Sequence, residues 1–251
     1  MKIDVTTDAR FADIGNLPSN FIPYNGEFTK LNIRQILLSE LKLLSRAAAT
    51  NDISSTIKAI NMTIDVDINR LTIGDFFYVL MWHKLHSFPK SPVTVNWLCT
   101  ATLHLDADGN IITDQTITPA KIEPCNQANT QIIHQTDIDI ISFEDGYEGI
   151  PANFDYPRVS MLAEYYELAK DPDFSALLDN VRWIREGATL AKKFEYLETL
   201  PNLDLYSEAE EINKATLHGV SQYVHLKCAR CEGKHRRVLD LDPVNFFRPC
   251  L

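Results

Sequence analysis

Two cysteines near the C-terminus, Cys228 and Cys231, have the spacing of a metal-binding knuckle. The two residues between them place both thiols on one short loop, where backbone N–H groups can point at the sulfurs. Gly233 permits the tight turn that follows. Structural zinc takes four such ligands, so this loop supplies half of a site. The other ligands must come from elsewhere in the chain.

The chain has five cysteines, and two of the remaining three lie in a region rich in β-forming residues. A fold that brings this region beside the knuckle would complete a tetrahedral site of four thiolates. We therefore predict a structural zinc ion. The predicted ligands are Cys99, Cys125, Cys228 and Cys231.

Other assignments of these residues stay open at this point. His225 and His235 flank the knuckle and are local substitutes for the distant cysteines. Cys250, next to the C-terminus, is predicted to be a free thiol. A decayed site, which leaves two thiols in a turn, is the alternative to zinc binding.

The remaining chemistry in the sequence argues against an enzyme. His83 and His86 lie three residues apart on a predicted helix and together suit a metal, as in a hydrolase. A role without metal explains the two histidines better: one packs in the core and the other contacts solvent. The sequence has no phosphate-binding glycine loop, Rossmann fingerprint, serine nucleophile elbow or zinc-protease helix motif. We therefore expect a protein without catalytic activity.

Composition narrows the class of partner. The 251 residues are 45% hydrophobic and 23% charged, with a net charge of −10, which weighs against broad binding to nucleic acid or anionic membranes. The chain starts without an apolar signal-peptide region, and no apolar run approaches the roughly 18 residues of a membrane span. The odd cysteine count indicates a reducing compartment.

One basic cluster departs from this acidic balance. It surrounds the knuckle and suits an acidic protein partner, with nucleic acid as the alternative. The cluster comprises Lys227, Arg230, Lys234, Arg236 and Arg237.

The order of predicted elements indicates an α+β fold, in which a helical bundle portion accompanies a small β-subdomain and a C-terminal zinc-knuckle-like hairpin. We predict five segments in chain order. They are an extended N-terminal arm at 1–35, a helical segment at 36–92, the β-subdomain at 93–145, a second helical segment at 158–219 and, at 220–251, the hairpin with its knuckle and aromatic tail.

Local signals predict several element boundaries. Thr72 and Asp75 have capping-box spacing at the start of a strongly apolar helix over residues 71–88, and Asp52 suits the N-cap of a helix at 53–61. Ser207 is expected to cap the last helix, at about 208–218. We also expect a short strand at 28–33 and, after an Asp-Gly turn, a return strand at 110–117.

Three blocks of sequence carry a family likeness. The first is a Leu-Pro-Ser segment at 17–19, followed by Tyr24 and residues 31–40. The second is the Leu-Thr-Ile-Gly-Asp entry to the helix at 71–80, and the third is the closing two-cysteine hairpin with the aromatic tail, 228–247. In this order the blocks resemble baseplate-hub and tail-assembly proteins of T-even-like contractile-tailed phages. The departure is the first cysteine arm, where Cys99 and Cys125 stand in place of a second Cys-x-x-Cys.

The resemblance implies a structural protein of the tail baseplate, in its hub region, made in the host cytoplasm and incorporated into the virion. Its partners would be other baseplate or tail proteins, or further copies of itself in a homo-oligomer within the baseplate, with no membrane or nucleic-acid role. A chaperone of hub assembly that is absent from the virion is the first alternative. An intracellular zinc-binding regulator that contacts nucleic acid is the second.

The arm and the tail are the expected contact regions, because proline-containing termini and adjacent aromatics suit docking on a neighbour. Packing of the tail against its own domain is the equal alternative. The predicted partner-binding residues are Leu17, Pro18, Phe21, Tyr24, Phe246 and Phe247.

Overall fold

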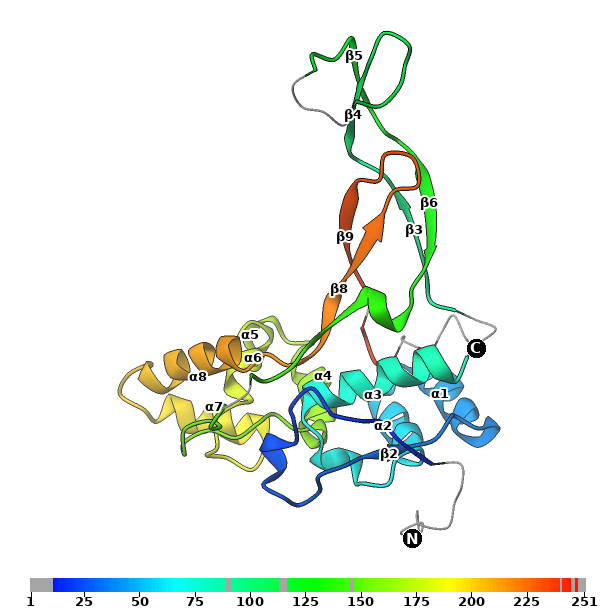
Figure 1. Cartoon of the computed structure of the whole chain (residues 1–251). Helices are drawn as coiled ribbons and strands as arrows, with labels where there is room; N and C mark the ends of the chain where they lie inside the picture. The colour runs from blue at the N-terminus through cyan, green and yellow to red at the C-terminus, as the bar shows by residue number, and fades with distance from the viewer. Residues whose placement is uncertain are drawn as a thin grey trace. The chain divides into compact units, whose positions relative to one another are not determined.

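The computed structural model describes residues 11–88, 92–112, 117–144, 147–239, 241–244 and 247 (Figure 1). The chain divides into two compact units. Unit 1 comprises residues 1–88, 140–220 and 241–251, and unit 2 comprises residues 89–139 and 221–240. Helices dominate unit 1 and antiparallel strands dominate unit 2, so the predicted α+β class is confirmed.

The N-terminal part of unit 1 contains three helices. They are α1 (Leu38–Thr50), α2 (Ile53–Asn61) and α3 (Ile73–His86). The predicted N-cap of α2 is confirmed, because the Asp52 side chain accepts a hydrogen bond from the backbone N–H of Ser54 at 2.9 Å. Helix α1 packs against α2.

Helix α3 begins as its sequence predicts. The Thr72 hydroxyl accepts a hydrogen bond from the backbone N–H of Asp75 at 3.2 Å, as an N-cap should. The following turns bury Phe76, Val79 and Leu80 completely. The capping signal and the predicted apolar face are therefore both confirmed.

The region before α1 differs from the expected extended arm. Only Asn32–Ile33 (β2) form a strand in place of the one expected at 28–33, and they pair antiparallel with Ala12–Asp13 (β1). Between them the chain makes a 3₁₀ turn at Ile22–Tyr24 (η2), since Pro23 fixes the local backbone angle and removes one donor.

Five shorter helices form the second part of unit 1. They are α4 (Leu162–Leu168), α5 (Pro172–Ser175), α6 (Leu178–Val181), α7 (Leu190–Glu198) and α8 (Asp204–Ala215). Ser207 is expected to cap a helix that starts at about 208, but α8 begins four residues before that, at Asp204, and Ser207 lies inside it. The earlier start lets Leu205 pack against the buried cluster around Trp183 and Ile184.

Unit 2 contains two successive antiparallel ladders. Thr94–Leu98 (β3) pairs with Ala128–Ile132 (β6), and Thr102–Leu105 (β4) pairs with Lys121–Pro124 (β5). The expected Asp-Gly turn is present, because Asp106 accepts backbone hydrogen bonds from Asp108 and Asn110. Of the return strand expected at 110–117, the described residues form only an isolated antiparallel bridge, in which Ile111 pairs with Leu105 and the Ile112 N–H donates to the His104 carbonyl at 2.8 Å. Residues 113–116 lie outside the described part of the chain.

The predicted C-terminal hairpin is confirmed. Gly219–Lys227 (β8) and Lys234–Val238 (β9) pair antiparallel, from Tyr223 opposite Val238 to Lys227 opposite Lys234. Ile138–Ile141 (β7) completes a three-stranded sheet in the order β7–β8–β9. Among the helices of the described chain, none has the length and apolar character that a membrane crossing requires.

Candidate metal centre

Strand ends in unit 2 bring the four predicted ligands together. Cys99 follows β3 and Cys125 follows β5, at the point where the ladder β3–β6 gives way to the ladder β4–β5. The backbone N–H of Cys99 donates to the Gln127 carbonyl at 2.9 Å, and that of Cys125 donates to the Ala101 carbonyl at 2.8 Å. These cross-strand hydrogen bonds hold the two cysteines on adjacent strands.

The knuckle forms the other half of the site. Cys228 follows β8 and its N–H donates to the Gly233 carbonyl at 3.0 Å, while the Glu232 N–H returns to the Cys228 carbonyl at 3.0 Å. Glu232 takes a left-handed backbone conformation, with φ of 57°. A Cβ at Gly233 would lie 3.1 Å from the Cys231 sulfur, so a larger residue would press on the site. The tight turn that the sequence predicts is therefore present.

The four sulfurs have the spacing of a tetrahedral metal site. All four lie within 4.8 Å of one another. Cys99 Sγ is 3.6 Å from Cys231 Sγ, and Cys125 Sγ is 3.8 Å from Cys228 Sγ. Zinc–sulfur bonds of about 2.3 Å place the sulfurs of a tetrahedron roughly 3.8 Å apart. The donor set therefore fits a closed, four-coordinate zinc ion. Within the described residues no other group of three or more potential ligands gathers in this way.

The surroundings of the sulfurs shift the pKa values of the cysteines in different directions. Burial alone disfavours a thiolate, and it raises the pKa of Cys99 to about 12. Burial acts in the same direction on Cys228, but backbone N–H groups of Cys231 and Arg230 outweigh it and lower the pKa of Cys228 to about 6. One thiolate is thus stabilised by the knuckle itself. A bound cation would supply the charge that the others need to ionise.

Polar groups around the sulfurs form a second layer. His235 Nε2 lies 3.2 Å from Cys99 Sγ, and its ring lies 4.5 Å from the Trp97 ring. The backbone N–H of Arg230 points at Cys228 Sγ at 3.4 Å, and the Asn129 amide donates to the same sulfur at 3.7 Å. His225 instead forms an exposed pair with Asp139 at 2.8 Å. Of the two alternative histidine ligands, only His235 lies against the cysteine cluster.

The predicted partner-binding residues of the arm lie mostly inside unit 1. Leu17 and Tyr24 are each 1% exposed, and Pro18 is also buried. Phe21 is half-buried, and its ring makes an edge contact with the Tyr24 ring at 6.4 Å. Burial gives Leu17, Pro18 and Tyr24 a packing role, and Phe21 alone among them keeps substantial surface. Their role in partner binding stays a prediction.

The predicted tail residues divide between described and undescribed parts of the chain. Phe247 is 1% exposed and its ring lies 5.8 Å from that of Phe88. This matches the alternative in which the tail packs on its own domain. Phe246 and Cys250 lie outside the described residues.

A buried polar network in unit 1 was missed at the sequence level. The Tyr24 hydroxyl and the Ser19 hydroxyl both donate to Asp75 Oδ2, and the Ser19 N–H donates to Asp75 Oδ1 at 3.0 Å. The backbone N–H of Thr72 donates to the Tyr24 hydroxyl at 3.1 Å. These residues belong to two of the family-like sequence blocks described above. The sequence signal for the network is that each is a polar residue within an otherwise apolar segment. The network ties the Leu-Pro-Ser segment to the start of α3.

Among the described residues, the two histidines of α3 belong to no cluster of three or more potential metal ligands. His83 is fully buried, and its Nε2 lies 2.8 Å from the Thr63 hydroxyl. His86 stacks on Trp82 at 4.5 Å, and its Nδ1 contacts the Trp82 carbonyl at 2.8 Å. Both side chains therefore have structural contacts.

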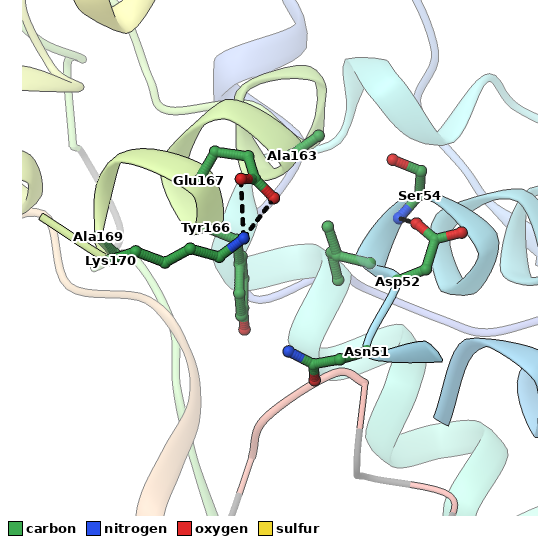
Figure 2. A pocket seen from close by; sticks show the side chains of 9 residues that line it. Asn51, Asp52, Ser54, Ala163, Tyr166, Glu167, Ala169 and Lys170 are labelled. Atoms are coloured by element: carbon green, nitrogen blue, oxygen red, sulfur yellow. Dashed lines mark hydrogen bonds and ion pairs between the residues drawn. The ribbon is translucent and has the colours of Figure 1, made fainter. Parts of the chain in front are cut away.

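A cavity of about 310 Å³ lies between the start of α2 and helix α4, within unit 1 (Figure 2). The charged groups that line the cavity interact with residues close to them in sequence. Lys170 Nζ pairs with Glu167 at 2.7 Å, and Asp52 caps α2. The sticks of Figure 2 show the Lys170–Glu167 pair along one wall of the opening. No convergent set of reactive groups points into this cavity from its lining residues, so the cysteine cluster is the better candidate site.

Comparison with known proteins identifies the family. A protein-family model described as T4 bacteriophage base plate protein matches residues 17–248. Neither the curated proteins nor the solved structures compared with the chain include a match. The matched range contains all four clustered cysteines, the helix α3 and the Leu-Pro-Ser segment. The resemblance read from the sequence is thereby confirmed, and the chain belongs to the family of T4 bacteriophage base plate proteins.

Proposed function

We propose that this chain is a structural component of the hub region of the phage baseplate and that it acts through protein–protein contacts during virion assembly. Family membership over residues 17–248 is the observation that carries this proposal. The match extends through both compact units, so it covers the chain's framework rather than one short motif. The proposed partners are other baseplate and tail proteins.

The cysteine cluster supports a structural rather than a catalytic role. Four thiolates satisfy a tetrahedral zinc ion completely and leave no open position for a substrate or an activated water. We propose that zinc fastens the β8–β9 hairpin to the strand junction at Cys99 and Cys125. Such a centre contributes directly to the folding free energy of a small unit. Unit 2 is small and strand-rich. Because a small unit buries little surface on folding, a cross-link of this kind adds stability that its core does not supply.

Quantitative mass spectrometry of purified phage particles tests the proposed function. A structural component should be present at a fixed copy number relative to other tail proteins, and that number should survive further purification. A chaperone of hub assembly would be abundant in infected cells and absent from the particles. Absence from particles that contain a complete baseplate would contradict the proposal in favour of the chaperone.

A further inference from the structure

The β8–β9 hairpin has two chemically different faces. Alternation along the strands buries Val224 and Leu226 on the inner face. The outer face is a ladder of three exposed cross-strand pairs, which we call the basic ladder. Its pairs are Lys227 opposite Lys234, His225 opposite Arg236, and Tyr223 opposite Val238.

The basic ladder contains an unfavourable arrangement of charge. Lys227 and Lys234 stand directly opposite one another, and like charges in that position destabilise an antiparallel pair. Lys227 has one counter-charge, Glu232, at 3.3 Å. Within the described part of the chain, neither Lys234 nor Arg236 makes an ion pair. The ladder has a second counter-charge, Asp139, at 2.8 Å from His225. Lys234 and Arg236 are therefore the cations of the ladder that lack a counter-charge within the described residues, and a partner can supply it.

The apolar end of the ladder favours a protein partner over nucleic acid. Val238 is 65% exposed, beside Tyr223 at 36%. The Arg236 guanidinium lies 3.7 Å from the centre of the Tyr223 ring, so that ring face is covered and cannot stack on a base. Arginine and aromatic side chains beside exposed aliphatic surface are typical of protein interfaces.

Helix α8 carries a surface of the opposite sign on the same polypeptide. Asp204, Glu208 and Glu211 are exposed and fall at positions i, i+4 and i+7, on one helix face. Within the described residues none of the three makes an ion pair, and like charges at this spacing cost helix stability. Exposed leucines lie just beyond both helix ends, Leu203 at 71% and Leu217 at 62%. We call this surface the acidic face.

The two surfaces also agree in spacing. Alternate residues along β9 are about 6.6 Å apart, and one turn of α8 rises about 5.4 Å, so cations and acids repeat at similar intervals. Each surface places apolar side chains beyond its charged stretch. The two surfaces are thus complementary in sign, and each has exposed apolar side chains beside its charged residues.

We propose that the basic ladder of one copy of this chain binds the acidic face of a second copy. The contact joins two different surfaces, so it is head-to-tail and produces a ring if the rotation closes. This proposal depends on the proposed function for one point only, namely that the contact between copies occurs in the baseplate. Particle mass spectrometry can therefore succeed while the self-association fails, and the two outcomes remain distinct.

Zero-length carbodiimide cross-linking of the full chain tests the contact directly, because it joins only amines and carboxylates that touch. Unlabelled and ¹⁵N-labelled chains are mixed before cross-linking. The expected product links Lys227 or Lys234 to Asp204, Glu208 or Glu211 in peptide pairs of mixed isotope composition. Links found only in pairs of a single isotope composition, with no mixed pairs, would show a contact within one chain and would overturn the proposal, as would the absence of such links.

Charge reversal supplies a second test by sedimentation of the full chain. Lys234→Glu with Arg236→Glu should raise the dissociation constant for self-association at least tenfold. Glu208→Lys with Glu211→Lys should do the same, and mixing the two double variants should restore association between them. The control, Lys42→Glu with Lys58→Glu, changes the same charge on exposed positions of α1 and α2 and should associate normally.

Besides failure of the mixed double variants, two results would overturn the proposal. One is a wild-type chain that stays monomeric at about 1 mM, a concentration at which even a contact of about 4 kcal/mol would be substantially occupied. The other is binding of a labelled single-stranded oligonucleotide that Lys234→Glu with Arg236→Glu abolishes, because it would assign the ladder to nucleic acid. Failure of the mixed double variants to associate, while each keeps wild-type zinc content, would likewise contradict the pairing of these surfaces.

Discussion

The sulfur of Cys99 lies 3.6 Å from the sulfur of Cys231, although 132 residues separate them in the chain. Cys125 and Cys228 form a second such pair, at 3.8 Å. Each close pair joins a strand junction of the first ladders to the C-terminal hairpin. The cysteine cluster thus joins the two chain segments that make up unit 2, residues 89–139 and 221–240.

The buried network around Asp75 should contribute measurably to the stability of unit 1. Tyr24→Phe removes a donor to the Asp75 carboxyl group and an acceptor for the Thr72 N–H, with little change in shape. Buried groups that lose a partner cost about 1–3 kcal/mol each, so we expect unfolding free energy to fall by about 2–3 kcal/mol. Urea unfolding at neutral pH measures this change.

Tyr165→Phe is the matched control for that substitution. Its hydroxyl also donates to an aspartate, Asp179 at 3.0 Å, but the contact is exposed to solvent. Water replaces the lost partner there, so the expected loss is below about 1 kcal/mol. An equal loss of unfolding free energy in the two variants would contradict the conclusion that the buried network around Asp75 stabilises unit 1.

His83 should make the stability of unit 1 depend on pH. Burial lowers the pKa of His83 from 6.5 to about 3, and the positive charges of Arg34 and His86 act in the same direction against the opposing effect of Glu40. Because the folded pKa lies below the unfolded one, stability is complete above pH 6.5 and is lost as the pH falls toward 3. The expected slope is about 1.4 kcal/mol per pH unit.

Urea unfolding of wild type and His83→Gln between pH 7 and about pH 5 isolates this group, because carboxyl groups titrate mostly below that range. The variant should be less stable at pH 7 and should have a flatter pH dependence. Parallel curves for the two proteins would show that His83 is not the source of the slope.

His235 should tune the metal centre without being one of its four ligands. Its Nε2 lies 3.2 Å from Cys99 Sγ, where an N–H can stabilise a thiolate. His235→Phe should lower zinc affinity by about 10–100-fold at unchanged stoichiometry, while His235→Gln, which keeps a donor, should recover part of the loss. Competition with a chromophoric chelator measures both. Loss of bound zinc at saturating metal in His235→Phe would instead make the histidine a ligand.

Signals that act over a few residues were readable in the sequence. Thr72 and Asp75 define the start of α3, Asp52 caps α2, and the Cys-x-x-Cys spacing of Cys228 and Cys231 marks the knuckle. Each depends on one turn of chain, so tertiary context did not change the outcome. Ser207 shows the limit, because α8 starts at Asp204 and Leu205, inside the helix, packs against the buried cluster around Trp183 and Ile184.

Long-range relationships were not readable in the same way. The juxtaposition of Cys99 and Cys125 depends on pairing β4 with β5, yet β5 ends in Pro124 and shows little alternation, while residues 110–117 look equally β-forming. Tyr24 suggested an exposed arm because prolines surround it. Its hydrogen bond to Asp75, 51 residues away, places it in the core, and no local pattern contains that information.

The most direct test of the zinc centre is native mass spectrometry of the full chain, purified without chelator from zinc-supplied cells. After equilibration with a chelator that only just leaves wild type saturated, we predict one zinc ion per wild-type chain and per Cys250→Ser chain, and almost none after Cys125→Ser or Cys228→Ser. One of four ligands to a structural zinc is worth about 3 kcal/mol, or roughly 100-fold in affinity. A wild-type chain that carries no metal, or a Cys125→Ser chain that keeps a full equivalent of zinc, would contradict the four-cysteine centre.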